Sequence, residues 1–418
     1  MQRQMTAVMR WLFVFALVAA ACTGSARPPT TLPQPIPGDA GSLGTVPGKL
    51  LVLDAEHTIS IIRPDGSDYR RLAGADPGIE ARTQPTWSPD GGRVAWTERT
   101  VDGASSLVTA STRGEILTRD SAPFLAVYLA WDPTGQAIAL SGHDEEGRLQ
   151  LGLSHPGTGV TTIDEGAPLW LDWGPDGTEL LLHVEDRLEL VPIDGTERQA
   201  IGHAGRFRVG LHAGDALLYA QGGATGEVLV VGDRAGSVRR ELLRVGDPTA
   251  FVSDPAGERI AVMSAPSAAT QAMARVEGGD TPVLDPNRLV IVHVADGTVQ
   301  EVARGRAVAW FWSPDGNRLL YSTIVYDHEN LPLRWYVWDG RSSAVYATFT
   351  PTGVFGRDYL AFFDQFDRSL TLWAPDGSAF VYAGGSSLED SGVWVQPVGE
   401  ESPVRVARGT MASWSPTP

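Results

Sequence analysis

The residues that could support binding chemistry lie in three long interruptions of an otherwise regular sequence. These interruptions run over Ala265–Pro286, Tyr326–Leu333 and Pro351–Arg368. The second and third are rich in aromatic and charged side chains, the residue types that anchor most interfaces. The candidate binding residues in and beside them are Tyr326, His328, Trp335, Phe355, Arg357, Tyr359, Phe363 and Arg368.

Two short runs could offer metal ligands. They are Tyr326-Asp327-His328-Glu329-Asn330 and His143-Asp144-Glu145-Glu146. Protein metal sites usually combine spaced ligands from more than one motif, whereas the ligands here are consecutive and have no partner motif. We interpret both runs as solvated loops and predict no metal site.

Motifs of known catalytic and cofactor sites are absent from the sequence. It contains no Gly-x-Ser-x-Gly elbow, no Gly-rich phosphate loop, no paired-His zinc motif and no Cys-x-x-Cys. We therefore predict no cofactor and no catalytic residues, and expect a binding protein rather than an enzyme.

One repeated unit positions these candidates, and its first clear copy is Trp87-Ser88-Pro89-Asp90-Gly91-Gly92-Arg93. Pro sets φ at the first corner of a tight turn, Asp can bond the backbone and Gly takes the position with φ > 0. Apolar residues then alternate as in a half-buried strand. We interpret the repeat Trp residues as core and the repeat Asp residues as turn formers. Further copies follow at Trp131, Trp173, Leu211, Val252, Trp312, Trp373 and Trp414.

The spacing of the repeat predicts an all-β fold. Successive intact copies lie roughly 40–45 residues apart, which is the length of one four-stranded propeller blade. The first unit, Lys49–Ala73, lacks a Trp strand, and Met411–Pro416 is a Trp strand with nothing after it. We therefore predict a β-propeller of eight blades, with seven as the alternative, closed by pairing of the C-terminal strand with the N-terminal blade.

The repeated W-S-P-D-G-x-R, followed by an apolar strand, resembles the TolB-type β-propeller repeat. This repeat also occurs in the propellers of prolyl oligopeptidase-like and dipeptidyl-peptidase-like enzymes. The resemblance covers Lys49 to Pro418 and implies the propeller fold. It also implies, loosely, a sensor or assembly subunit of an envelope complex.

Blade connectivity sorts the loops onto two faces of the ring. The tight Gly turns after the first and third strands of each blade share one face, here called the turn face, which we expect to be scaffold. The three interruptions share the opposite face, here called the insertion face, where binding is expected. The aromatic residues of Pro351–Arg368 either line the mouth of the channel or plug the ring, and the sequence leaves both open.

A further set of residues precedes the repeat Trp positions and is expected near the channel axis. Several arginines there could attract an anionic ligand, although salt bridges between blades are the stronger interpretation. The predicted channel-lining residues are Arg82, Gln84, Tyr128, Trp170, Arg208 and Arg306.

The N-terminus has the features of an export signal. Arg3 and Arg10 flank the start of the apolar run Trp11–Ala21, and Cys22 is the only cysteine of the chain. The run resembles a bacterial lipoprotein signal, with Ala19 where that family prefers Leu; an ordinary secretory signal is the alternative. We predict a signal peptide over 1–21, a lipidated Cys22 with a Pro-, Thr-, Ser- and Gly-rich tether over 22–48, and a propeller over 49–418.

The formal charge of −17 disfavours nucleic acid as a partner, because tracking phosphates requires clustered Lys and Arg. We predict an exported, monomeric propeller, held to the membrane by its lipid and facing the periplasm or the cell exterior. It would bind a protein, peptide or glycan through the insertion face. The alternatives are a lyase or glycoside hydrolase working at the channel mouth, and a sensor or assembly subunit.

Overall fold

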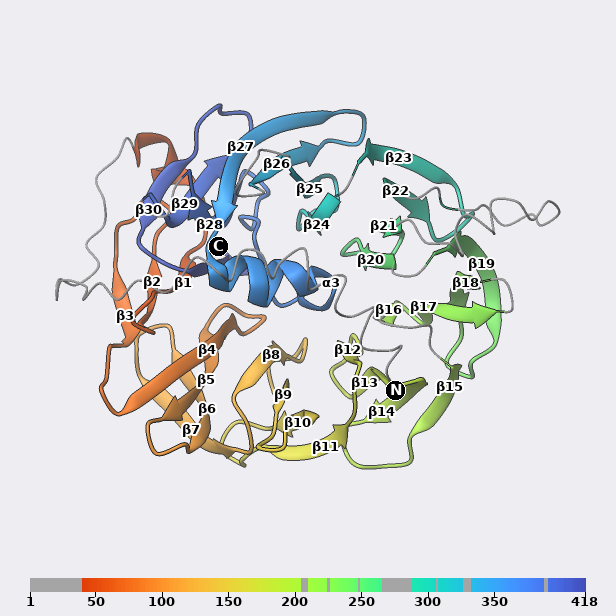
Figure 1. Cartoon of the computed structure of the whole chain (residues 1–418), viewed down its shortest axis with the longest axis horizontal. Helices are drawn as coiled ribbons and strands as arrows, with labels where there is room; N and C mark the ends of the chain where they lie inside the picture. Colours follow the sequence, from red (N-terminus) through yellow and green to blue (C-terminus); the bar gives the residue numbers. More distant parts are fainter. Residues whose placement is uncertain are drawn as a thin grey trace.

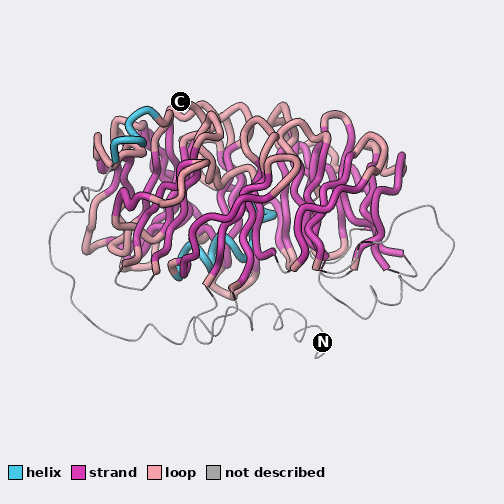
Figure 2. The backbone as a smooth tube through the Cα atoms, turned by 90° about the horizontal axis from the view of Figure 1, so that it is seen from above, coloured by secondary structure: helices cyan, strands magenta, loops and turns pink. Residues whose placement is uncertain are grey.

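The chain forms a ring of antiparallel β-sheets around a central axis (Figure 1). The computed structural model describes residues 40–203, 210–223, 226–246, 249–264, 284, 287–305, 307–325, 332–386 and 390–418. Seen from the side, the strands run between two faces of a flat disc (Figure 2). This arrangement is a β-propeller, as the sequence predicts.

Five of the sheets are built from four consecutive strands each, in the order in which they occur along the chain. These strands are β4 (Ile79–Trp87), β5 (Arg93–Thr100), β6 (Ser105–Ser111) and β7 (Ile116–Ala122); β8 (Ala126–Trp131), β9 (Ile138–His143), β10 (Leu149–Ser154) and β11 (Thr161–Glu165); β12 (Leu169–Trp173), β13 (Glu179–Val184), β14 (Arg187–Pro192) and β15 (Gln199–His203); β16 (Leu211–Ala213), β17 (Ala216–Gly223), β18 (Gly226–Gly232) and β19 (Val238–Val245); and β20 (Thr249–Ser253), β21 (Arg259–Ser264), β22 (Arg288–His293) and β23 (Val299–Arg304).

The two ends of the chain share one sheet, which closes the ring. Its order is β3 (Arg70–Ala73), β2 (Ile59–Ile62), β1 (Leu50–Leu53) and β31 (Met411–Trp414). Strand β31 pairs antiparallel with β1, with Trp414 opposite Leu50 and Met411 opposite Leu53. The predicted closure by the C-terminal strand is confirmed.

The remaining sheet has seven strands and contains two sequence repeats. It comprises β24 (Ala307–Trp312), β25 (Leu319–Ile324), β26 (Leu333–Trp338), β27 (Ser343–Pro351), β28 (Ala379–Gly385), β29 (Gly392–Pro397) and β30 (Val404–Ala407). Strands β27 and β28 pair at two positions, Thr350 with Gly385 and Pro351 with Gly384. Trp373 contributes a single bridge to Phe380 in place of a full inner strand. Eight sequence units therefore correspond to seven hydrogen-bonded sheets in the described part of the chain.

The repeat residues fasten each sheet to its neighbour. The indole nitrogen of Trp131 donates to the carbonyl of Thr86, and that of Trp173 donates to Ala130, both at 3.4 Å. Arg93 donates to the carbonyl of Gly135 at 2.7 Å and lies over the Trp131 ring. These contacts place the repeat Trp and Arg side chains in the scaffold, as expected for the Trp residues.

The repeat Asp residues form the tight turns. In the first copy, Asp90 accepts hydrogen bonds from the Gly92 N–H at 3.0 Å and from the Ser88 hydroxyl. Asp376 does the same with the N–H and hydroxyl of Ser378. Their interpretation as turn formers is confirmed.

The folded region begins before the expected boundary at Lys49. A 3₁₀-helix, η2 (Ala40–Thr45), precedes β1, and Leu43 in it is fully buried in the main core. The last residues of the segment that we expected to be a tether are therefore packed on the ring. The signal peptide, Cys22 and the rest of the tether lie outside the described residues. Within the described ranges, no helix is long and apolar enough to cross a membrane.

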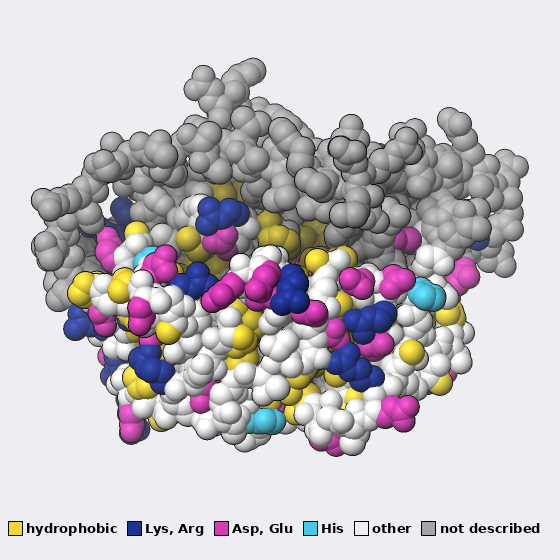
Figure 3. All heavy atoms as spheres, turned by 60° about the horizontal axis from the view of Figure 1, so that its bottom comes forward, with side chains coloured by type: hydrophobic (Ala, Val, Ile, Leu, Met, Phe, Trp, Pro, Cys, Tyr) yellow, Lys and Arg dark blue, Asp and Glu magenta, His cyan; other side chains and the backbone are white. Residues whose placement is uncertain are grey.

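Charged side chains on the outer wall are arranged in pairs of opposite sign. Arg187 contacts Asp164 at 3.1 Å and Glu189 at 2.9 Å, and Arg148 contacts Asp144 at 2.7 Å. Figure 3 shows one side of the ring, where basic and acidic side chains interleave. On this side, the surface offers no continuous basic stripe for a polyanion.

Candidate functional site

The third insertion crosses the centre of the ring as three short helical segments. They are the π-helix η3 (Phe355–Tyr359), the 3₁₀-helix η4 (Leu360–Phe362) and α3 (Phe363–Phe366), and residues 355–368 are called the plug below (Figure 1). The ring centroid of Phe363 lies 4.3 Å from that of Trp310, and Phe366 lies 5.0 Å from Tyr128. The aromatic residues therefore fill the ring, which decides between the two alternatives that the sequence left open.

Four of the predicted binding residues are core residues in this structure. Trp335 and Phe355 are fully buried, and Tyr359 and Phe363 are 3% and 4% exposed. The expectation that they form accessible aromatic anchors on the insertion face is wrong for these four. The plug turns Phe355, Tyr359 and Phe363 into the gap between sheets, and Trp335 packs on Phe349 and Phe380 within its own sheet.

The other four predicted binding residues do not form one surface in the described part of the chain. Arg357 is exposed and pairs with its neighbour Asp358 at 2.7 Å. Arg368 lies at the end of the plug and faces the channel. Tyr326 and His328 lie outside the described residues. The plug also exposes Phe362, 46% accessible, whose ring lies 6.5 Å from that of Trp170.

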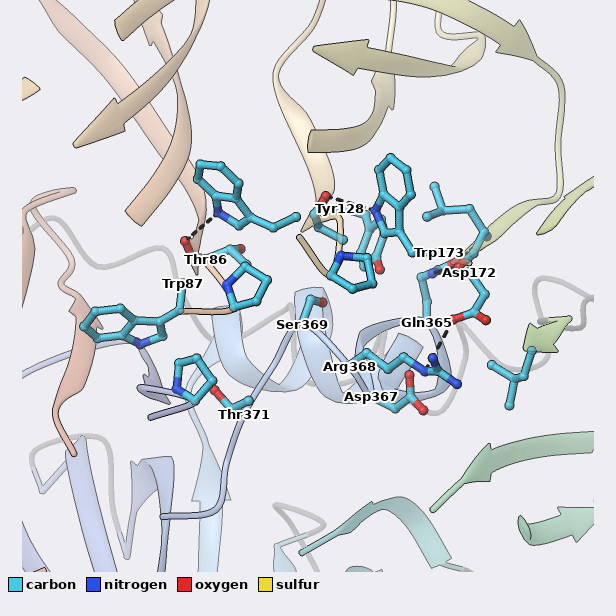
Figure 4. A pocket seen from close by; sticks show the side chains of 17 residues that line it. Thr86, Trp87, Tyr128, Asp172, Trp173, Gln365, Asp367, Arg368, Ser369 and Thr371 are labelled. Atoms are coloured by element: carbon cyan, nitrogen blue, oxygen red, sulfur yellow. Dashed lines mark hydrogen bonds and ion pairs between the residues drawn. The ribbon is translucent and has the colours of Figure 1, made fainter. Parts of the chain in front are cut away.

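A cavity of about 260 Å³ lies between the plug and the turn face (Figure 4). The repeat prolines Pro89 and Pro133 belong to the turn face and contribute to its lining, as does Pro416 near the C-terminus. The turn face, expected to be scaffold alone, therefore borders the cavity. The remaining lining residues are Thr86, Trp87, Tyr128, Ala130, Trp131, Leu171, Asp172, Trp173, Leu211, Gln365, Asp367, Arg368, Ser369 and Thr371.

Arg368 fastens the end of the plug to three sheets. Its Nε lies 3.4 Å from Oδ1 of Asp172 on β12. One Nη donates to the backbone carbonyl of His212 on β16 at 3.1 Å and to the hydroxyl of Ser253 on β20 at 3.3 Å. The Asp172 carboxylate raises the pKa of the Arg368 guanidinium, so this group remains charged.

Asp172 is the buried centre of a chain of charged groups. Its Oδ2 accepts the backbone N–H of His212 at 2.6 Å and lies 2.9 Å from His212 Nδ1. On the far side of the imidazole, Nε2 lies 3.5 Å from Glu179, which pairs with Arg234. Burial opposes ionisation of Asp172, but the Arg368 charge and the hydrogen bonds of His212 outweigh it and lower the pKa of Asp172. Asp172 is therefore a fixed anion.

Asp367 differs from Asp172 both in its contacts and in the direction of its pKa shift. It lines the cavity beside Arg368 (Figure 4), and its carboxylate makes no hydrogen bond or ion pair with the side chains described in this structure. Burial raises the pKa of Asp367 to about 8, and the nearby Asp172 and Asp364 add to the effect, while Arg368 opposes it. The cavity thus holds one carboxylate, that of Asp172, which is paired, and one, that of Asp367, which forms no ion pair with a described side chain.

The predicted channel-lining arginines do not form an anion-binding ring among the described residues. Arg82 is 6% exposed, pairs with Glu98 at 3.0 Å, and donates to the carbonyl of Gly74 at 2.7 Å. Its hydrogen bond to Gly74 connects two sheets and its ion pair with Glu98 lies within one sheet, so Arg82 belongs to the scaffold, which agrees with the stronger of the two interpretations. Arg208 and Arg306 lie outside the described residues.

The uncharged members of that set divide between the cavity and the core. Tyr128 lines the cavity. Gln84 is 4% exposed with φ of 56°, and Trp170 is half-buried beside Phe362. No group of three His, Cys, Asp or Glu side chains in the described ranges is arranged to hold a metal ion.

Comparison with known proteins gives matches at the level of the fold. No protein-family model and no curated protein matches the chain. Among solved structures, the dihydro-heme d1 dehydrogenase NirN in complex with DHE is similar over 96% of this chain and 85% of its own, with a TM-score of 0.57 and 13% identity. A eukaryotic initiation factor is similar over 89% of this chain and 99% of its own, with a TM-score of 0.55 and 13% identity. At such identities the similarity concerns the fold alone.

TolB from Acinetobacter baumannii is a weaker match. It has a TM-score of 0.39 and 16% identity over 72% of this chain and 65% of its own.

Sequence reasoning missed Asp172 and Asp367, although one signal was present. The residue before the repeat Trp is uncharged in the other copies, such as Thr86, Ala130 and Ser413, whereas Asp172 occupies this place before Trp173. A carboxylate at an inner-strand position that otherwise packs against the next sheet must have a partner inside the ring. Asp367 carried no comparable signal, because its environment depends on how the plug folds.

Proposed function

We propose that this protein is an exported, lipid-anchored binding propeller whose ligand site is the cavity between the plug and the turn face. The observation that carries the proposal is the carboxylate of Asp367 on the wall of that cavity, which forms no ion pair with a described side chain. A purely structural plug has no need of a carboxylate at this position, because desolvation and the neighbouring Asp172 and Asp364 oppose its ionisation. The export signal and Cys22 support the lipid anchor.

The cavity favours a small molecule or a single side chain of a partner over a glycan or an extended peptide. Its volume of about 260 Å³ lies just below the usual range for small-molecule sites. The lining combines Trp and Tyr rings with a few polar groups, which is typical of such sites.

A cavity-filling variant tests the proposal. The full chain in detergent is screened by ligand-observed NMR against amines, amino acids, carboxylates and sugars. We expect at least one class to bind, and Ala130→Phe, which fills the cavity, to reduce that binding tenfold or more. Val127→Phe is the control, because Val127 lies on the same strand, β8, but is 46% exposed. The proposal fails if no compound binds, or if a folded Ala130→Phe protein binds as well as wild type.

A second candidate is an enzyme working in the same cavity. It is favoured by one observation: Asp172 and Asp367 line one cavity, and their surroundings shift the two pKa values in opposite directions, as in acid and base pairs of hydrolytic enzymes. A panel of chromogenic glycosides tests it. Turnover lost in Asp367→Asn and Asp172→Asn, but kept in Asp358→Asn, would support this candidate; the absence of turnover in wild type would exclude it for these substrates.

A further inference from the structure

Among the residues that the structure describes, the charges on the cavity wall do not balance. Arg368 is the cation on its wall, and its Nε is already engaged by Asp172 at 3.4 Å. The remaining bonds of this guanidinium go to the His212 carbonyl and the Ser253 hydroxyl. When Asp367 ionises, the described part of the wall therefore carries two negative charges, on Asp172 and Asp367, and one positive charge, on Arg368.

The other lining groups suit a cation. Trp87, Trp173 and Tyr128 are among the lining residues, and aromatic rings attract ammonium and guanidinium groups. An anion would be repelled by the carboxylates on the wall. It would have to approach the carboxylates of Asp172 and Asp367.

We propose that this cavity is a binding site for a small organic cation, carrying an ammonium or guanidinium group, with Asp367 as its counter-ion. The inference rests on the proposed binding function and specifies the class of ligand. A bound cation would provide the ion pair that Asp367 lacks and would place its apolar part against the Trp rings.

Binding of such a ligand must be coupled to the proton of Asp367. In the described part of the chain, the charged and titratable groups facing Asp367 are Arg368 and Asp364 on the plug, Asp172 on β12 and the phenol of Tyr128 on β8. A cation binds the ionised carboxylate, so it must displace the proton that is held below pH 8. Affinity should therefore fall as the pH is lowered from 8, approaching tenfold per pH unit.

Three probes of one shape test the charge preference. Full-length protein carrying 19F-labelled tryptophan is titrated with n-butylammonium, n-butanol and n-butyrate, and the tryptophan resonances report binding. We expect n-butylammonium to bind at least tenfold more tightly than the other two at pH 8. Asp367→Asn should remove this preference, and the pH dependence with it, whereas Asp358→Asn, which changes an outward-facing carboxylate of the same plug, should keep both.

The outcomes separate this inference from the proposed function. If n-butyrate or n-butanol binds best, or if Asp367→Asn keeps the preference for the amine, the cation site is wrong and the binding function stands. If no probe shifts a tryptophan resonance in wild type at millimolar concentration, the cation site is wrong as well. The proposed function then depends on the separate screen with Ala130→Phe. A neutral Asn keeps the shape of the side chain, so unfolding of Asp367→Asn is not expected and thermal melting verifies it.

Discussion

Gln365 of the plug hydrogen-bonds both backbone groups of Leu171, accepting from its N–H at 3.0 Å and donating to its carbonyl at 2.8 Å. Leu171 lies in β12, the innermost strand of its sheet, and the side-chain amide takes the place that a further strand would have at this edge. The plug is therefore held by ladder-like bonds in addition to the packing of its rings.

The first prediction concerns this amide. Gln365→Ala leaves the buried N–H and carbonyl of Leu171 without partners, which should cost about 2–4 kcal/mol in the free energy of unfolding. The control is Gln300→Ala, whose side chain donates to Gly340 on the exposed surface and should change stability by less than about 0.5 kcal/mol. Urea denaturation measures both. Equal stability of the two variants would contradict a fastening role for Gln365.

The second prediction compares two adjacent phenylalanines of the plug. Phe363 is 4% exposed and packs on Trp310, whereas Phe362 is 46% exposed. Phe363→Ala should lower the unfolding free energy by about 3–5 kcal/mol, because it leaves a cavity in the ring. Phe362→Ala should change it by less than about 1 kcal/mol. A Phe363→Ala protein with an unchanged melting temperature would show that the plug does not contribute to the core.

The third prediction concerns closure of the ring. Deleting 411–418 removes β31 and exposes the inner edge of β1 from Leu50 to Leu53. We expect loss of cooperative melting or aggregation, since an unpaired hydrophobic strand edge can pair with other chains. Deleting only Thr417 and Pro418 leaves β31 in place and should melt as wild type does. Differential scanning calorimetry with light scattering distinguishes the two, and an unchanged curve for the longer deletion would overturn the closure model.

The fold could be predicted from sequence because its determinants are local. The turn of Ser88, Asp90 and Gly92 is built from residues within the motif itself. Each copy of the motif therefore predicts one pair of adjacent strands. The pairing of β31 with β1 followed from counting strands at the two ends.

The site could not be predicted in the same way. The pKa of Asp367 is raised by burial and by the nearby Asp172 of β12 and Asp364 of the plug. These groups come together only in the folded ring, so no local sequence pattern predicts the shift. The aromatic residues of the plug were visible in the sequence, but their direction was not, because a helical insertion can turn the same rings outward or inward.

The fourth prediction concerns the membrane anchor. Cys22 follows the apolar run that ends at Ala21 and is the only thiol in the chain. Cys22→Ser should move the protein from the detergent phase to the aqueous phase in detergent partitioning, because serine removes the thiol that the proposed acylation requires. Substitution of Ser25, three residues further along the tether, should have no effect. Wild-type protein found in the aqueous phase would show that the chain is not lipidated.

The last prediction is a pH dependence of stability that belongs to Asp367. Its pKa is about 8 in the folded protein and about 3.9 in an unfolded chain. Between these values the folded state holds a proton that the unfolded state has released. The contribution of this group to folding is therefore most favourable below pH 4, is lost progressively as the pH rises to about 8, and is constant above that.

Asp367→Asn isolates this contribution, because the amide does not titrate. The difference in unfolding free energy, variant minus wild type, should grow in favour of the variant from pH 5 to pH 8 and then level off. Asp172 gives the opposite sign: its pKa is lowered in the folded state, so its contribution is lost on acidification. If the difference in unfolding free energy between wild type and Asp367→Asn does not change from pH 5 to pH 8, then the pKa of Asp367 is the same in the folded protein as in the unfolded chain, and this prediction is wrong.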